Sequence, residues 1–142
     1  MNLRENLISV FLLPLLLPLH PTVHAGQTPE GLAIAASEVW LSLVDEGRYT
    51  ASWNEAAQLF KRAITEEQWE ATLNAFRSPL GKVLSRRVIS KQYTHTLPGA
   101  PDGEYAVIQY ETSFENKKLA IETLTPMLDE DGKWRISGYY LK

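Results

Sequence analysis

Residues 119–141 decide the fold: they read LAIETLTPML (119–128), DEDG (129–132) and KWRISGYYL (133–141). Apolar and β-branched residues run up to Asp131-Gly132 and resume directly after it, which predicts two antiparallel strands joined by a tight turn. We expect the upstream segments to cover one side of this hairpin.

Two registers of the hairpin are open. A two-residue loop sets apolar side chains opposite polar ones, whereas a three-residue loop that ends at a left-handed Gly132 places Leu128 opposite Trp134. We prefer the second register because a one-sided sheet needs apolar and polar residues on separate faces. In that register Glu122 lies opposite Tyr140 and points toward the core. The apolar face then consists of Leu124, Leu128, Trp134, Ile136 and Tyr140.

The composition is that of a globular protein with one domain. The chain has 142 residues, of which 44% are hydrophobic and 22% charged, and its net charge is -3. This length fits one domain rather than two. A negatively charged chain has no overall attraction for a polyanion, so we do not expect nucleic acid as a partner.

The first 25 residues are predicted to be a signal peptide. After a short polar start, residues 7–19 form an apolar run, and Val23-His24-Ala25 places small residues where a signal peptidase reads them. The run is short for a membrane-spanning helix, and prolines interrupt it. Cleavage after Ala25 would leave one α+β domain, residues 26–142, periplasmic or secreted and without a stable membrane span. An uncleaved N-terminal anchor is the alternative.

The chain contains no cysteine, and His95 is the one histidine that remains after cleavage. Disulfides, thiol catalysis, thiolate metal sites and lipid anchoring through cysteine are therefore excluded. A single histidine cannot supply a site with several histidine ligands. We expect neither a metal nor a cofactor.

Three amphipathic helices are expected before any strand. Thr28-Pro29 is a good start for the first helix and Gly47 a good end. Capping-box patterns that begin at Ser52 and Thr65 predict the second and third helices. The first helix is expected to turn inward a stripe of Leu32, Ala36, Val39, Trp40 and Leu43. The other two are expected to contribute Trp53, Phe60, Trp69 and Phe76 to the core.

The pattern changes to strands after Gly81. Residues 83–97 are rich in β-branched residues but alternate poorly, as is typical of a long, bent or edge strand, and residues 106–114 alternate cleanly. With the hairpin, they predict an α+β fold: three N-terminal helices packed on one face of a four-stranded antiparallel meander. The large aromatic side chains of both layers either fill the core or leave a conical cavity, and the sequence leaves both open.

Several segments together carry a family resemblance. They include Trp40-Leu41, Pro79-Leu80-Gly81, LPGAPDGEY at 97–105, Thr125-Pro126-Met127 and Gly138-Tyr139-Tyr140. Through them the chain resembles an exported bacterial family, the domain of unknown function 4019, over residues 32–141. The resemblance implies a layout similar to the cystatin-like and nuclear-transport-factor-like cone folds. Such folds host ligand pockets, isomerases and interaction modules alike, so the resemblance implies no particular activity.

Glu122 is the candidate with the sharpest chemistry. It is a carboxylate on an apolar strand face near Tyr140 and Tyr110. A carboxylate that abstracts a proton beside a tyrosine hydroxyl that binds an oxyanion is the pairing that an isomerase needs. The alternative is a structural carboxylate hydrogen-bonded to Tyr or Arg. We assign no catalytic residue and treat Glu122, Tyr110, Tyr140 and Trp134 as candidate pocket residues.

The proline- and glycine-rich turn at 98–103 offers a second candidate. Its Asp102, with the nearby His95, could form a recognition surface, because functional residues often lie on loops held by a rigid scaffold. Plain turn chemistry is the alternative.

Basic residues gather between the last helix and the first strand. They are Arg77, Lys82, Arg86, Arg87 and Lys91. We interpret them as surface charges, solvated or paired with the acidic residues of the preceding helix. Binding to an anionic surface is the alternative.

The sequence favours an exported module that binds a small apolar ligand or a protein partner in or beside the cone. Two alternatives stay open. One is a small isomerase or dehydratase that uses Glu122 with a tyrosine, and the other is a structural protein that assembles through its sheet face, for example as a homodimer. A cavity lined by Glu122, Tyr110 and Tyr140 would favour a ligand or a substrate.

Overall fold

The computed structural model describes residues 28–142, and the predicted signal peptide lies outside these residues. The helices of this part are α1 (Pro29–Asp45), α2 (Tyr49–Asn54), α3 (Gln58–Ala63), α4 (Glu66–Phe76) and a short 3-10 helix (Ser78–Leu80). The strands are β1 (Val83–Thr94), β2 (Tyr105–Phe114), β3 (Lys117–Leu128) and β4 (Trp134–Leu141).

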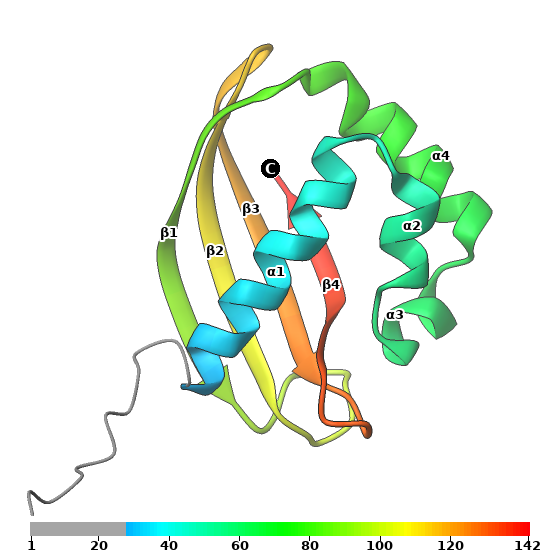
Figure 1. Cartoon of the computed structure of the whole chain (residues 1–142), viewed down its shortest axis with the longest axis vertical. Coiled ribbons are helices and arrows are strands. Elements are labelled where there is room, and N and C mark those ends of the chain that lie inside the picture. The colour runs from blue at the N-terminus through cyan, green and yellow to red at the C-terminus, as the bar shows by residue number, and fades with distance from the viewer. Residues whose placement is uncertain (1–27) are drawn as a thin grey trace, which may run out of the picture.

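The strands form one antiparallel sheet of four, in the order β1-β2-β3-β4. The sheet bends around α1, which crosses its face, while α2, α3 and α4 lie beyond β4 (Figure 1). The expected α+β fold, with its helices before a four-stranded meander, is thus confirmed. None of the helices in residues 28–142 is long and apolar enough to cross a membrane.

Side-chain caps fix where two of the helices begin, as predicted. Thr28 Oγ1 accepts a hydrogen bond from the backbone N–H of Gly31 at 3.1 Å and starts α1. Thr65 and Gln68 cap each other reciprocally at 3.2 and 3.1 Å and start α4. Each cap satisfies backbone donors that have no partner inside the helix.

The predicted second helix is wrong in its start and its continuity. The chain forms two short helices there, because the backbone N–H of Ala57 leaves the helical pattern and donates to Ile136 O of β4 at 2.9 Å. Ser52 is no N-cap. It lies inside α2, where its hydroxyl donates to Tyr49 O and accepts from Trp69 Nε1 at 3.0 Å.

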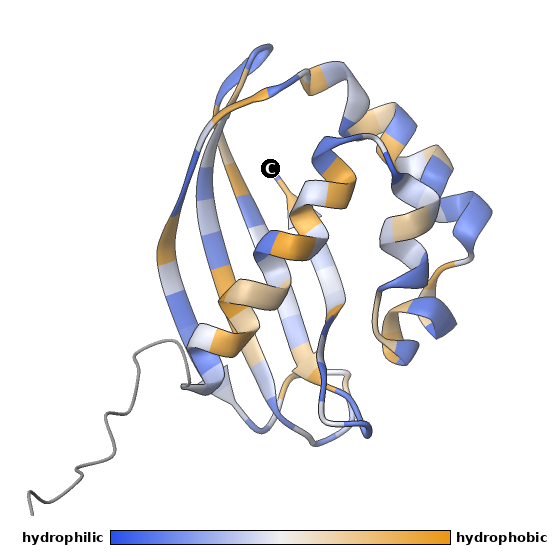
Figure 2. Ribbon diagram, in the orientation of Figure 1, coloured by the Kyte–Doolittle hydropathy of each residue, from blue (hydrophilic) through white to orange (hydrophobic). Residues whose placement is uncertain are grey.

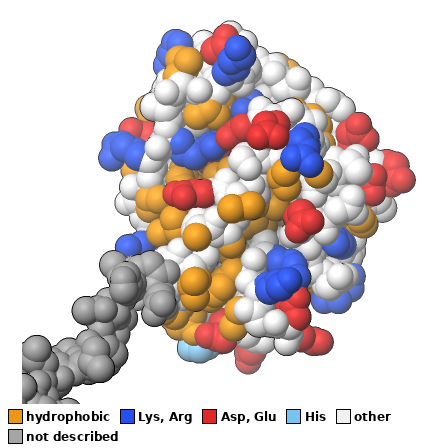
Figure 3. Space-filling model, in the orientation of Figure 1, with side chains coloured by type: hydrophobic (Ala, Val, Ile, Leu, Met, Phe, Trp, Pro, Cys, Tyr) orange, Lys and Arg blue, Asp and Glu red, His pale blue; other side chains and the backbone are white. Residues whose placement is uncertain are grey.

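The predicted inward stripe of α1 is wrong for Leu32 and Val39, whereas Trp40 is buried and Ala36 and Leu43 are half-buried. Val39 is 69% exposed and Leu32 45% exposed. The residues that α1 buries are Ala33, Ser37, Trp40, Leu41 and Val44. Small side chains at Ala33 and Ser37 let the helix approach the sheet closely, and Leu32 and Val39 are left outside. Apolar residues accordingly recur along α1, and hydrophobic side chains show on the face that it crosses (Figures 2 and 3).

The hairpin register is as preferred near the turn and differs beyond it. Leu128 pairs with Trp134 and Pro126 with Ile136, but Thr125 pairs with Gly138. Ser137 is therefore an extra residue, a β-bulge, and its hydroxyl donates to Thr125 O at 2.6 Å.

The bulge corrects the predicted pairing of Glu122 with Tyr140. Past Ser137 the side chains exchange faces, so Tyr139 points inward opposite Leu124 and Glu122 pairs with Leu141. Tyr140 is 63% exposed on the other face.

An aromatic cluster fills the space between the helices and β4. Trp40, Phe60, Trp69 and Tyr139 pack with ring centroids 4.9 to 6.3 Å apart. Phe76 was expected there, but it lies in the last turn of α4 and is 73% exposed. Of the two possibilities left open by the sequence, a filled core and a conical cavity, this part of the structure has the filled core.

Candidate functional site

Glu122 lies on the helix-facing side of β3, where none of its surface is exposed (0%). One carboxylate oxygen accepts hydrogen bonds from Arg86 Nε at 2.8 Å and from Thr112 Oγ1 at 2.6 Å. The other accepts from the Tyr139 hydroxyl at 2.5 Å. These donors come from β1, β2 and β4, so Glu122 ties its strand to the rest of the sheet.

Arg86 extends this contact to the helices. Its terminal nitrogens Nη1 and Nη2 donate to both oxygens of Asp45, the last residue of α1, at 2.6 and 3.0 Å. Arg77, just after α4, donates to the same carboxylate at 3.1 Å and to Gly81 O at 2.8 Å. We call Asp45, Arg77, Arg86, Thr112, Glu122 and Tyr139 the buried network.

The buried network is electrically balanced, because Arg77 and Arg86 face Asp45 and Glu122. Burial opposes the charge of Arg86, but its hydrogen bonds and the charges of Asp45 and Glu122 outweigh that effect and raise the pKa of Arg86. Burial, with the charge of Glu122, raises the pKa of Tyr139 well above its ordinary value. Tyr139 therefore stays protonated at neutral pH and acts as a donor.

Tyr110 neighbours Glu122 across the β2–β3 ladder but does not join the buried network. Its hydroxyl is buried close to the Ser37 hydroxyl, which itself donates to Ala33 O. Burial, together with the charge of Glu38, raises the pKa of Tyr110 to about 12.

A groove of about 510 Å³ opens between α4 and the end of β4. We call it the α4–β4 groove. We call its buried and half-buried lining residues, Trp69, Leu73 and Tyr139, the floor, and its exposed lining residues, Phe76 and Tyr140, the rim. Arg77 and Lys117 also line it. Its volume lies within the usual range for small-molecule sites.

The floor of the α4–β4 groove is held in place by the core beneath it. Tyr139 and Arg77 belong to both the groove and the buried network. Trp69 donates through Nε1 to Ser52 Oγ and packs edge-on against Tyr139, with ring centroids 6.1 Å apart. A site formed by side chains fixed in this way is preorganised for a ligand.

Local sequence explains how these side chains meet. The capping box at Thr65 sets the phase of α4, so that Trp69, Leu73, Phe76 and Arg77 fall on one helix face at positions i, i+4, i+7 and i+8. On β4, the bulge at Ser137 turns Tyr139 into the floor and leaves Tyr140 at the rim.

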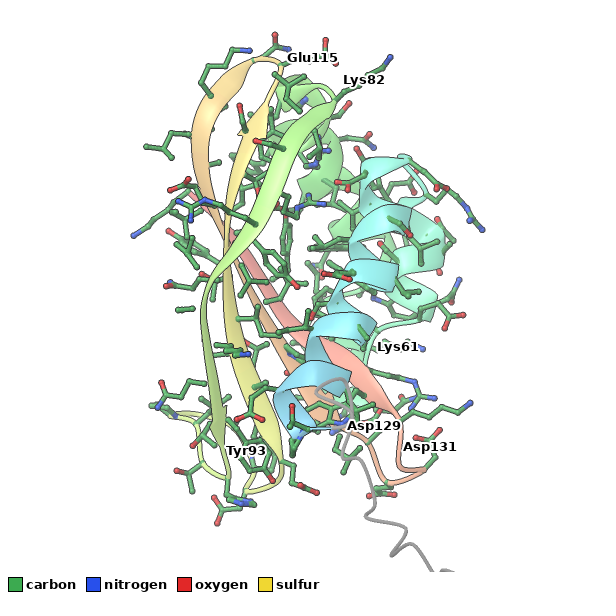
Figure 4. All side chains as sticks on the ribbon, turned by 60° about the vertical axis from the view of Figure 1, so that its left-hand side comes forward. Lys61, Lys82, Tyr93, Glu115, Asp129 and Asp131 are labelled. Carbon is green, nitrogen blue, oxygen red and sulfur yellow. The ribbon has the colours of Figure 1, made fainter. Side chains whose placement is uncertain are left out.

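Two further grooves lie elsewhere on residues 28–142. One of about 750 Å³ separates the β3–β4 hairpin from α3 and is lined by Lys61, Asp102, Asp129 and Asp131 among others. Figure 4 shows Lys61 on the helical side and both Asp129 and Asp131 on the hairpin at that end of the molecule. The other, of about 590 Å³, lies between α1 and β4 and includes Val39 and Trp134.

The predicted site residues do not converge on one pocket. Glu122 and Tyr110 are neighbours in the core, whereas Tyr140 and Trp134 line two different grooves. Asp102 lines the hairpin groove.

His95 lies outside these grooves. It is exposed and packs edge-on against Tyr93, with ring centroids 5.0 Å apart. No group of three or more His, Asp or Glu side chains in residues 28–142 is arranged to hold a metal ion.

A family model described as protein of unknown function, DUF4019, matches residues 36–139. The chain belongs to this family. The match confirms the resemblance drawn from the sequence, and it spans every residue of the buried network. Tyr140 and Lys142, at the rim of the α4–β4 groove, lie beyond the matched range. No curated protein matches the chain.

The sequence of this DUF4019 chain suggested Tyr or Arg as the kind of partner for Glu122, but it did not identify Arg86 and Tyr139, nor the link through Arg77 to Asp45. Arg77 and Arg86 were interpreted as surface charges, yet both are largely buried. A signal for them existed, since a carboxylate on an apolar strand face requires a buried cation or several donors. No comparable signal marked Tyr139, because it faces inward only as a result of the bulge.

Proposed function

We propose that this protein is an exported binding module that takes a small apolar ligand in the α4–β4 groove. The observation that carries the proposal is that two exposed aromatic residues, Phe76 at 73% and Tyr140 at 63%, line the same groove as the buried Trp69 and Leu73. Large exposed apolar side chains around a hollow are typical of a ligand site. The leader sequence supports export.

The isomerase alternative receives no support from the geometry around Glu122. Both carboxylate oxygens already accept hydrogen bonds, Arg86 balances the charge, and the residue lines none of the three grooves. A general base must reach the proton that it abstracts. We therefore propose a structural role for Glu122. Assembly as a homodimer through the sheet face stays a prediction.

Binding of a neutral solvatochromic dye such as Nile red tests the proposed site. We expect saturable binding that weakens about tenfold in Phe76→Ala and in Tyr140→Ala, because each substitution removes apolar contact worth about 1–3 kcal/mol. Fluorescence titration gives the dissociation constants.

Val39→Ala is the matched control, since Val39 is apolar, 69% exposed and outside the groove. Its dye affinity should equal that of the unmodified protein. Equal affinities in all variants, or an equal loss in all of them, would place the dye elsewhere and overturn the proposal.

A further inference from the structure

We propose that the ligand of the α4–β4 groove is a single-chain anionic amphiphile, a long-chain carboxylate, whose charged end lies at Lys117. This inference rests on the proposed function and specifies its ligand. The charge of the groove supports this inference. The whole chain has a net charge of -3, whereas the groove is lined by cationic side chains and by no carboxylate side chain.

Lys117 is the cation that is free to meet a ligand. It is half-buried in the groove wall and forms no ion pair within residues 28–142. Lys142 also lines the groove, but it bears the carboxylate of the printed C-terminus as well as its ammonium group. Lys117 therefore carries the argument.

Arg77 adds a second, independent observation. Its side chain is only 4% exposed, it lines the groove, and its Nε has no hydrogen-bond partner among the described residues. A buried donor without a partner is unfavourable until an acceptor reaches it. Its other nitrogens are held by Gly81 and Asp45, and its guanidinium lies 4.5 Å from the ring centroid of Phe114, so the group is fixed in place.

The rest of the groove suits the apolar part of such a ligand. Trp69, Leu73 and Tyr139 line it with apolar surface, and the exposed Phe76 and Tyr140 extend that surface toward the solvent. A volume of about 510 Å³ fits a ligand of small-molecule size better than a phospholipid with two acyl chains. The groove thus selects a molecule that is apolar along its length and anionic at one end.

The test compares ligands that share a chain and differ in their end group. Dodecanoate, dodecanol and dodecyltrimethylammonium are each titrated below micelle formation against the protein with bound Nile red. We expect all three to displace the dye, and dodecanoate to bind about tenfold more tightly than dodecanol, which corresponds to about 1.4 kcal/mol. Dodecyltrimethylammonium should bind most weakly.

Substitution of the cation isolates its contribution. In Lys117→Gln the preference for dodecanoate should vanish while the affinity for dodecanol stays, and in Lys117→Glu the preference should turn toward dodecyltrimethylammonium. Lys118→Gln is the control, because Lys118 is exposed, adjacent in sequence and outside the groove. Circular dichroism confirms folding, and if a Lys117 variant does not fold, the end-group series on the unmodified protein decides.

The outcomes separate this inference from the proposed function. Equal affinity for the three amphiphiles would keep the groove as an apolar site and overturn the anionic ligand. Failure of every amphiphile to displace the dye would overturn both. Co-sedimentation with phosphatidylglycerol vesicles, without binding of free dodecanoate, would point to a membrane surface and would also overturn the inference.

Discussion

At the scale of the residue, the main feature is a carboxylate that the fold encloses completely. A buried ion pair gives little net stability, because removing two charges from water offsets most of their attraction. Removing one partner is different, since it leaves the other charge buried and unbalanced. Glu122 accepts hydrogen bonds from side chains of three other strands, so its role is to fix how those strands are arranged.

Replacing Glu122 by Gln should therefore destabilise the protein strongly. We expect a loss of about 3 kcal/mol in the free energy of unfolding, because Arg86 loses a charge partner at a site with 0% exposure. Urea denaturation followed by circular dichroism measures the change. Glu111→Gln is the control: Glu111 pairs with an arginine that is 69% exposed and should lose less than about 1 kcal/mol. Similar losses in the two variants would contradict the structural role of Glu122.

Single residues were predictable where local chemistry decides them. The inward direction of Glu122 follows from strand alternation, and it is confirmed by full burial. The identity of its partners was not predictable, because Asp45 and Arg86 are 41 positions apart and meet only after the helix has packed on the sheet. An ion pair between residues so far apart in the chain produces no periodic sequence pattern from which it could be predicted.

At the scale of the element, the β-bulge in β4 determines which tyrosine reaches the core. If Ser137 paired regularly with Thr125, the register set by the turn would carry Tyr140 inward, as the sequence suggested. Because Ser137 bulges instead, Tyr139 donates to Glu122 and Tyr140 borders the α4–β4 groove. The bulge at Ser137 thus decides that Tyr139 lies in the core and Tyr140 at the groove.

Deleting Ser137 should preserve this arrangement, since Thr125 already pairs with Gly138 and Leu124 with Tyr139. We expect the shortened chain to fold with a loss of about 1 kcal/mol for the hydrogen bond from Ser137 to Thr125 O. Deleting Thr123, which lies in regular pairing, should prevent folding because all residues on one side of the gap change faces. Thermal melts compare the two deletions, and equal tolerance of both would contradict the assigned register.

Helices show the same limit of sequence reasoning. The capping box at Thr65 predicted α4 correctly, because a cap is a local interaction. The inward stripe of α1 was wrong because close packing favours Ala33 and Ser37 over the larger Val39. Helix periodicity shows that an apolar face exists, but the neighbouring layer decides which residues it accepts.

At the scale of the whole molecule, no disulfide supports the fold, because the chain contains no cysteine. Stability rests on packing such as that of the aromatic cluster, while the buried network fixes how the helices and strands meet. The described part begins at Thr28, close to the predicted cleavage site after Ala25.

Processing at Ala25 is the last expectation that can be measured directly. Protein recovered from the periplasm or the medium should begin at Gly26, as determined by intact mass spectrometry, because small residues at positions 23 and 25 allow cleavage there. Ala25→Asp should block cleavage and retain the full-length chain in the membrane fraction. Ala35→Asp, an exposed change within α1, is the control and should leave processing unchanged. Full-length unmodified protein in the membrane fraction would instead establish the uncleaved anchor, and the α4–β4 groove would then face its ligand beside a membrane.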